Sequence, residues 1–195
     1  MSELFLVSPM PPSVNVYLRT HSYIKNGQAY SNSYTTLAAK NYKQCFAETI
    51  KRECKKQDFA LIENKHQHIY VDCTFYFARV NQDPNNYFKL LCDAITDSGC
   101  VWYDDNVCCE RVNAIYYDAS NPRIELHIYP VEYVGIFASR DQLAEFENHC
   151  KDCSRYREGR CSLLIRAQEG YVSKEITVTE THPTCSAYKL RKKGK

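Results

Sequence analysis

The chain has 195 residues, of which 44% are hydrophobic and 25% are charged, and its formal net charge is +2. This composition allows a buried core and excludes both a disordered chain and a strongly basic protein that coats DNA. No apolar run approaches the roughly 20 residues of a membrane span, and no basic segment precedes the first apolar stretch, so we expect a cytoplasmic protein with no membrane partner.

The N-terminal part predicts a strand, an extended segment, a loop and a helix. Residues 3–8 are typical of a short strand that ends at a proline cluster. Residues 13–19 are expected to be extended and polar, and residues 21–34, rich in Ser, Asn, Tyr and Gly, to form a loop. From 35 to 56, apolar residues recur at three- and four-residue spacing, which predicts a helix.

The middle of the chain carries the clearest periodicities. Residues 69–78 alternate strictly between apolar and polar side chains, which predicts a strand. A helix is predicted from Asp83 to Gly99 because its apolar residues form a single stripe. Two further strands, 107–117 and 123–129, are joined by five residues and are predicted to pair as a hairpin.

A last helix is predicted at residues 139–149, before a cysteine-rich segment. The mixture of strands and helices lacks a repeating βαβ rhythm, so we predict an α/β (α+β) protein with a mixed sheet and flanking helices. The expected domains are residues 1–135 and residues 136–195, the second comprising a helix, a small metal-stabilised module and a basic tail.

Polar side chains gather around the predicted helix that starts near Asp83. Asn86, Lys89 and Asp93 lie at i, i+3 and i+7, so they share the face opposite the apolar stripe. The other polar residues of this group lie near the helix. Asp83 and Asn85 are at its start, and Asp104 and Asp105 follow its end through a short loop. Converging oxygens of this kind suit Mg²⁺, and a nearby lysine can stabilise charge that develops on a phosphate.

Each of these residues also has a purely structural explanation. Asp83 before Pro84 is a good helix N-cap followed by proline in the first turn. Asp104 and Asp105 also suit a solvated turn, and Lys89 a helix surface.

Several segments together resemble the RusA family of Holliday-junction resolvases. Residues 83–95 are similar to the family's Asp-x-Asp-Asn-x-x-Lys-x-x-x-Asp-Ala-Leu pattern, and residues 102–105 to its Trp-x-Asp-Asp loop. Residues 11–19 resemble its Pro-Pro-Ser-x-Asn-x-Tyr-x-Arg segment, and the final strand, residues 123–128, also fits. The resemblance covers about residues 4–132, in the family's order.

The resemblance implies a RusA-like fold and a homodimer that binds four-way DNA junctions and cuts two strands symmetrically, in recombination and repair. By position, Asp83 and Asp105 are metal-binding carboxylates, Lys89 is a supporting cation and Asn86 is a positioning residue, with Asp93 and Asp104 close by. The metal, Mg²⁺, would activate water for in-line attack on a phosphodiester and stabilise the leaving oxygen.

One departure from the family pattern bears on activity. Asn85 stands where the family has an aspartate, and an amide oxygen can ligate Mg²⁺ but brings no charge. Asp93 or Asp104 would compensate for this loss. Otherwise the chain is expected to bind junctions and to cut them weakly or not at all. For DNA contact we predict that Arg19, Lys25 and Arg79 meet phosphates and that Tyr17 or Tyr23 stacks on opened bases.

Four of the eleven cysteines stand apart from the apolar patterns. Cys150, Cys153, Cys161 and Cys185 follow the spacing C-x2-C-x7-C-x23-C, which favours a metal site over disulfides. Zn²⁺ is the first expectation and a [4Fe–4S] cluster the second. His149 and His182 flank the segment as alternative ligands. A third possible function is that the core only supports a metal module that senses redox state or docks a partner.

Overall fold

The chain folds as two units. The computed structural model describes residues 3–179 and 182–191. Unit 1 comprises Met1–Lys65 and Ile69–Pro130, and unit 2 comprises His66–His68 and Val131–Lys195. Within the described ranges, no helix is long and apolar enough to cross a membrane. The architecture is the mixed α+β class that the sequence predicts.

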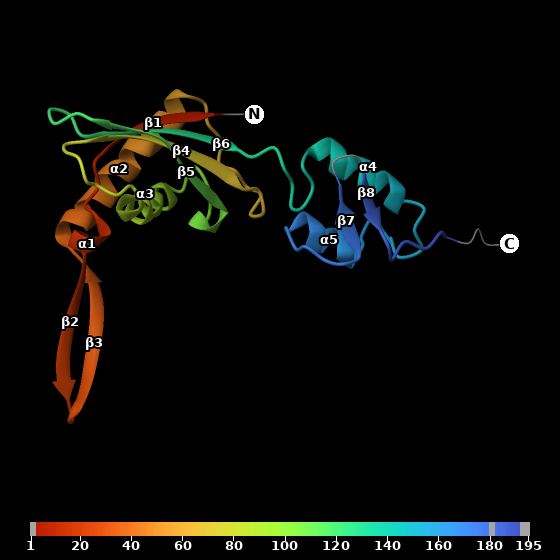
Figure 1. Cartoon of the computed structure of the whole chain (residues 1–195), viewed down its shortest axis with the longest axis horizontal. Helices are drawn as coiled ribbons and strands as arrows, with labels where there is room; N and C mark the ends of the chain where they lie inside the picture. Colours follow the sequence, from red (N-terminus) through yellow and green to blue (C-terminus); the bar gives the residue numbers. More distant parts are fainter. Residues whose placement is uncertain (1–2, 180–181, 192–195) are drawn as a thin grey trace. The chain divides into compact units, whose positions relative to one another are not determined.

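A four-stranded mixed sheet is the centre of unit 1 (Figure 1). Its strands are β1 (Leu4–Pro9), β4 (Ile69–Phe77), β5 (Cys108–Tyr117) and β6 (Arg123–Pro130), in the order β1-β6-β4-β5. β6 runs antiparallel to both β1 and β4, whereas β4 and β5 are parallel neighbours. The predicted strands at these positions are confirmed.

The predicted hairpin between the last two strands is wrong, because β4 lies between β5 and β6. The connection between them passes the end of β4, where the Asp118 N–H donates a hydrogen bond to the Phe77 carbonyl at 2.8 Å. Five residues are long enough to cross two strand spacings of about 4.8 Å each. A short connection therefore did not require the two strands to be neighbours.

Two helices cover one face of this sheet, α2 (Leu37–Lys56) and α3 (Asn85–Ser98) (Figure 1). The apolar residues of β4 predicted to share one face are all buried, and they pack with both helices in one core. α3 connects β4 to the parallel β5 and ends at Gly99, which adopts the left-handed conformation (φ 66°) that glycine tolerates best. Both helices were predicted from their spacing and are confirmed.

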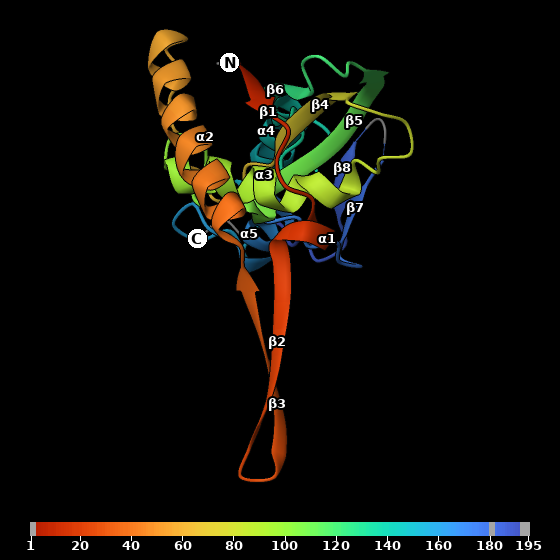
Figure 2. The ribbon, with the colours of Figure 1, turned by 90° about the vertical axis from the view of Figure 1, so that its left-hand side faces the viewer.

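The segment between β1 and α2 differs from the prediction. Residues 13–19 do not form one extended stretch, because a short helix, α1 (Val14–Tyr17), comes first. The predicted loop at 21–34 is instead an antiparallel hairpin of β2 (Leu18–Lys25) and β3 (Gln28–Thr35), which extends away from α1 in Figure 2. Both strands are solvent-exposed, so they show no apolar alternation. The missed signal was Asn26-Gly27, a typical two-residue turn with both φ angles positive (53° and 75°).

Unit 2 is small and has its own core. It contains α4 (Arg140–Cys150), which confirms the predicted helix, and α5 (Ser162–Gln168). Strands β7 (Ile176–Val178) and β8 (Pro183–Cys185) pair antiparallel. The fully buried core residues are Phe137, Phe146, Leu164, Ala167 and Ile176. Gly135 is required by close packing, since a Cβ there would overlap the backbone of Ala167 and Gln168.

Candidate active site

One exposed face of α3 carries the polar residues that the sequence singled out. Asn85, Lys89 and Asp93 follow each other at four-residue intervals, so they form one row along the helix. The Lys89 ammonium lies 3.3 Å from the Asp93 carboxylate. Asp93 raises the pKa of Lys89 most, through its charge and its hydrogen bond, and Asp105 also raises it. Lys89 is therefore paired with Asp93 and lies near enough to Asp105 for that carboxylate to raise the pKa of Lys89 as well.

Asp83 lies at the start of this helix and has a structural role there. One of its carboxylate oxygens accepts a hydrogen bond from the Asn85 N–H at 3.0 Å, and its carbonyl accepts one from the Asn86 N–H at 3.2 Å. These two bonds form a turn around Pro84, the N-cap of α3, so Asp83 stabilises the start of the helix from one residue earlier than a cap. An ionised carboxylate has about four acceptor positions, so this role leaves Asp83 able to contact a cation as well.

A loop anchored by two buried residues carries the second pair of aspartates. Val101 and Trp102 are buried, and the Trp102 indole N–H donates to the Thr96 hydroxyl of α3 at 2.7 Å. The loop leads into η1 (Asp105–Val107), a short 3₁₀ helix that contacts α3. Because the tryptophan fixes the loop against α3, Asp105 lies close enough to Lys89 to act on its charge.

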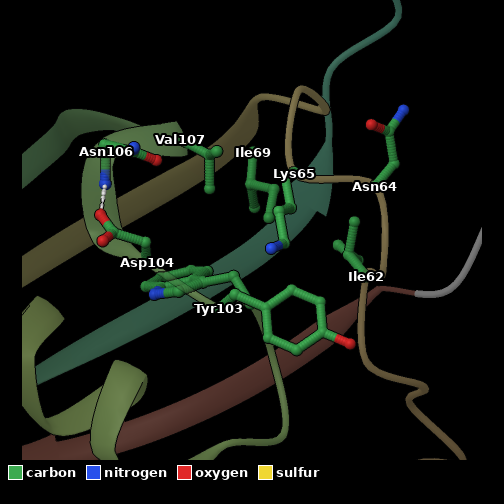
Figure 3. A pocket seen from close by; sticks show the side chains of 9 residues that line it. Ile62, Asn64, Lys65, Ile69, Tyr103, Asp104, Asn106 and Val107 are labelled. Atoms are coloured by element: carbon green, nitrogen blue, oxygen red, sulfur yellow. Dashed lines mark hydrogen bonds between the residues drawn. The ribbon is translucent and has the colours of Figure 1, made fainter.

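Asp104 is engaged differently from Asp105. Its carboxylate accepts a hydrogen bond from the Asn106 N–H at 2.9 Å and so caps η1. It also lines a cavity of about 320 Å³ in unit 1 together with Lys65 and Tyr103, as Figure 3 shows. The expectation that Asp104 compensates for Asn85 at a metal stays a prediction, and the capping bond is its observed role.

Tyr17 is placed by α1 in a way that the sequence did not predict. Tyr17 is 4% exposed, so stacking of its ring on an opened base, which stays a prediction, would first require the ring to be uncovered. Burial raises the pKa of Tyr17, the charge of Asp93 raises it further, and the charge of Lys89 lowers it. Tyr17 therefore belongs to the surroundings of the α3 row.

The other predicted DNA contacts lie on exposed parts of unit 1. Arg19 and Lys25 are on the hairpin, and Arg79 follows β4. Tyr23 stacks on Tyr30 across the hairpin with ring centroids 5.6 Å apart, and the two residues are 38% and 41% exposed. Sequence reasoning missed Tyr30, which the Asn26-Gly27 turn signal would have placed opposite Tyr23.

The donor set around α3 suits a hard divalent cation. Asp83 and Asp105 supply carboxylate oxygens and Asn85 an amide oxygen, which are the ligand types that Mg²⁺ takes. Among the described residues, no three His, Cys, Asp or Glu side chains form a ready metal-binding group. A cation here would rest on two carboxylates and one amide, with Lys89 beside them.

The four predicted cysteine ligands belong to unit 2. Cys150, Cys153, Cys161 and Cys185 line one small cavity and are all free thiols. The metal at these cysteines, Zn²⁺ or [4Fe–4S], stays a prediction at this point. Of the predicted basic tail, residues 192–195 lie outside the described part of the chain.

Comparison with known proteins agrees with the residues around α3. The family model described as "Endodeoxyribonuclease RusA" matches residues 9–129, which is more than half of the chain. The matched range contains the whole α3 row, Asp83 and the loop that carries Asp105. A search of curated proteins gave no match. The chain therefore belongs to the RusA family of endodeoxyribonucleases.

Proposed function

We propose that this protein is a Mg²⁺-dependent, structure-selective endonuclease that hydrolyses phosphodiesters in Holliday junctions and other branched DNA during recombination and repair. Family membership supports a junction-resolving endonuclease. The observation that carries the proposal for this chain is the exposed row on α3, where the Lys89 ammonium lies 3.3 Å from the Asp93 carboxylate and the charge of Asp105 also raises the pKa of Lys89. A phosphate that approaches this face meets a fixed positive charge beside oxygen donors suited to Mg²⁺.

The residues of the row and those next to it have separate tasks in this proposal. Asp83, Asn85 and Asp105 would hold Mg²⁺, which when bound supplies an activated water and neutralises charge on the phosphate. Lys89 stabilises the negative charge that develops on the phosphate oxygens, and Asp93 keeps its ammonium in position at 3.3 Å. Asn86, one turn before Lys89, is a neutral hydrogen-bonding group that positions the DNA backbone.

The test is cleavage of a synthetic four-way junction by the full chain with and without Mg²⁺, beside a linear duplex of the same arm sequence. We expect paired cuts in the junction only, and their loss in Asp105→Asn. Asp97→Asn is the matched control, because Asp97 is an exposed α3 carboxylate that pairs with Lys43 outside the row. Equal cutting of the duplex, or full cutting by Asp105→Asn, would contradict the proposal.

A second candidate is a junction-binding protein with weak or no cleavage. The observation that favours it is Asn85, which leaves the donor set one negative charge short of the family pattern. Junction binding measured by gel shift in Ca²⁺, alongside cleavage in Mg²⁺, separates the two candidates. Tight, junction-selective binding without cuts would support the second candidate and would exclude the first.

A further inference from the structure

Four cysteines from three separate segments of unit 2 meet at one enclosed space. Cys150 ends α4, Cys153 lies in the turn that follows, Cys161 precedes α5, and Cys185 ends β8. All four line a cavity of about 20 Å³ whose other walls include Phe146, Leu164 and Ile176. Cys150, Cys161 and Cys185 also pack against the buried core cluster of unit 2.

Backbone hydrogen bonds tie these segments together around Cys153. An isolated bridge pairs Cys153 with Leu190, and the Ser154 N–H donates to the Lys189 carbonyl at 2.7 Å.

The thiols of unit 2 differ in their surroundings from those of unit 1. Cys54, Cys73 and Cys92 are buried in the large core of unit 1, where cysteine acts as a small apolar residue. The core cluster described in unit 2 has five buried residues, which is a small core for a segment of this length. A bound metal is a common source of stability for such segments.

We propose that Cys150, Cys153, Cys161 and Cys185 form a tetrahedral Zn²⁺ site that holds the segments of unit 2 together. The inference is independent of the proposed nuclease function. In the described residues no three His, Cys, Asp or Glu side chains are already arranged as a metal-binding group, so the thiolates must turn inward to close the site. The flanking histidines do not line the cavity, and the Nδ1 atoms of both hydrogen bond to Glu145.

The size of the cavity favours one ion over a cluster. A space of about 20 Å³ holds roughly one water-sized sphere. Zinc is a single atom that thiolates approach to about 2.3 Å. A [4Fe–4S] cube contains eight atoms and would require the cysteine segments to move apart. The small volume therefore favours a single Zn²⁺ ion over a cluster.

The experiment measures metal in the full chain, purified without chelators or metal-affinity resin. Elemental analysis is expected to find about one zinc per chain. Exchange with Co²⁺ is expected to give the visible d–d bands of a tetrahedral site and strong thiolate-to-cobalt charge transfer. Cys153→Ser and Cys185→Ser are expected to lose most of the metal, whereas Cys45→Ser keeps it, because Cys45 is exposed on α2 of unit 1.

Three results would overturn the zinc site. They are iron with acid-labile sulfide, a wild-type cobalt spectrum without thiolate bands, and full zinc retention in Cys153→Ser. The cobalt spectrum is recorded on the wild-type chain, so the test stands even if the serine variants fail to fold. Junction cleavage in Mg²⁺ is assayed separately, so failure of either proposal leaves the other measurable.

Discussion

At the residue scale, position 85 departs from the RusA pattern. The chain has Asn85 where the family has an aspartate, so an amide NH₂ group replaces one carboxylate oxygen. Asn85 is exposed and lies in a row with Lys89 and Asp93. Because the side chain faces solvent, a charged residue at position 85 would not have to be buried. An aspartate has the same shape and adds a negative charge beside Asp83 and Asp105. The charge strengthens attraction for a divalent cation and leaves the helix unchanged.

We expect Asn85→Asp to raise cleavage of a four-way junction at limiting Mg²⁺ by about tenfold or more, where tenfold corresponds to about 1.4 kcal/mol of barrier. The measurement is a single-turnover rate as a function of Mg²⁺ concentration. Asn81→Asp is the control, because it adds the same charge in the loop before the helix, at a left-handed position (φ 63°) that aspartate tolerates. An unchanged rate for Asn85→Asp would mean that residue 85 does not limit the chemistry.

A second residue-scale feature is an ion pair on the sheet face opposite α2 and α3. Asp72 of β4 is 7% exposed, and both of its carboxylate oxygens accept hydrogen bonds from Arg111 of β5. The Tyr129 hydroxyl of β6 also donates to Asp72 at 3.0 Å. Burial raises the pKa of Asp72, but these bonds outweigh it and hold the pKa below its ordinary value of 3.8. The network joins three adjacent strands.

This shift predicts how stability depends on pH. Because the folded pKa is depressed, the Asp72 contribution is complete above the ordinary value and is lost as pH falls through the lower folded value. We expect Asp72→Asn to destabilise unit 1 by about 1–2 kcal/mol at neutral pH. Denaturant unfolding between pH 7 and pH 2 should also show a shallower loss of stability below about pH 4. A slope identical to wild type would show that Asp72 does not titrate in the folded state as proposed.

At the element scale, the β2–β3 hairpin is exposed on both faces, so its side chains contribute little to the core. Because the hairpin has no apolar face to bury, the side chains on both of its faces are accessible to a partner such as DNA. We propose that its stacked pair, Tyr23 and Tyr30, contacts unstacked bases at a junction and that Arg19 and Lys25 contact phosphates.

We expect the double variant Tyr23→Ala/Tyr30→Ala to bind a four-way junction at least about tenfold more weakly, since stacking contributes roughly 1–3 kcal/mol per base. Its unfolding temperature should match wild type. Tyr117→Ala is the control, because Tyr117 is an exposed tyrosine (58%) on β5, outside the hairpin. Loss of stability equal to the loss of affinity, or equal weakening by Tyr117→Ala, would show that the hairpin rings do not contact DNA specifically.

At the scale of the whole molecule, the substrate sets a symmetry requirement. A four-way junction presents two equivalent strands, and paired cuts need two active sites related by a two-fold axis. One chain carries one α3 row and one Asp105 loop. We therefore propose that the active form is a homodimer, as the family resemblance implies.

The expected solution mass from light scattering is about twice the 22.7 kDa of one chain, with or without junction DNA. A mixing experiment extends this test, because a dimer of one wild-type and one Asp105→Asn subunit should nick one strand without resolving the junction. A monomeric mass at concentrations where the junction is resolved would contradict the proposal.

The sequence alone determined the elements whose periodicity reports one buried face, which are β4, α2 and α3. It also determined that the candidate site residues surround one helix, because Asp83 to Asp93 are separated by helical spacing and Asp105 follows through a short loop. These features are local, so residues near in sequence carry the whole signal.

Only the tertiary structure decided which strands are neighbours, which polar groups are buried and which distant residues meet. β4 lies between β5 and β6, a pairing that a five-residue connection does not specify. Tyr17 is buried and lies near enough to Lys89 to affect its pKa. Asp104 caps η1, whereas the charge of Asp105 raises the pKa of Lys89. Long-range packing and hydrogen bonding decide the strand order, the burial of Tyr17 and the contacts of the two aspartates. The free energy of each of these arrangements depends on residues far away in the chain.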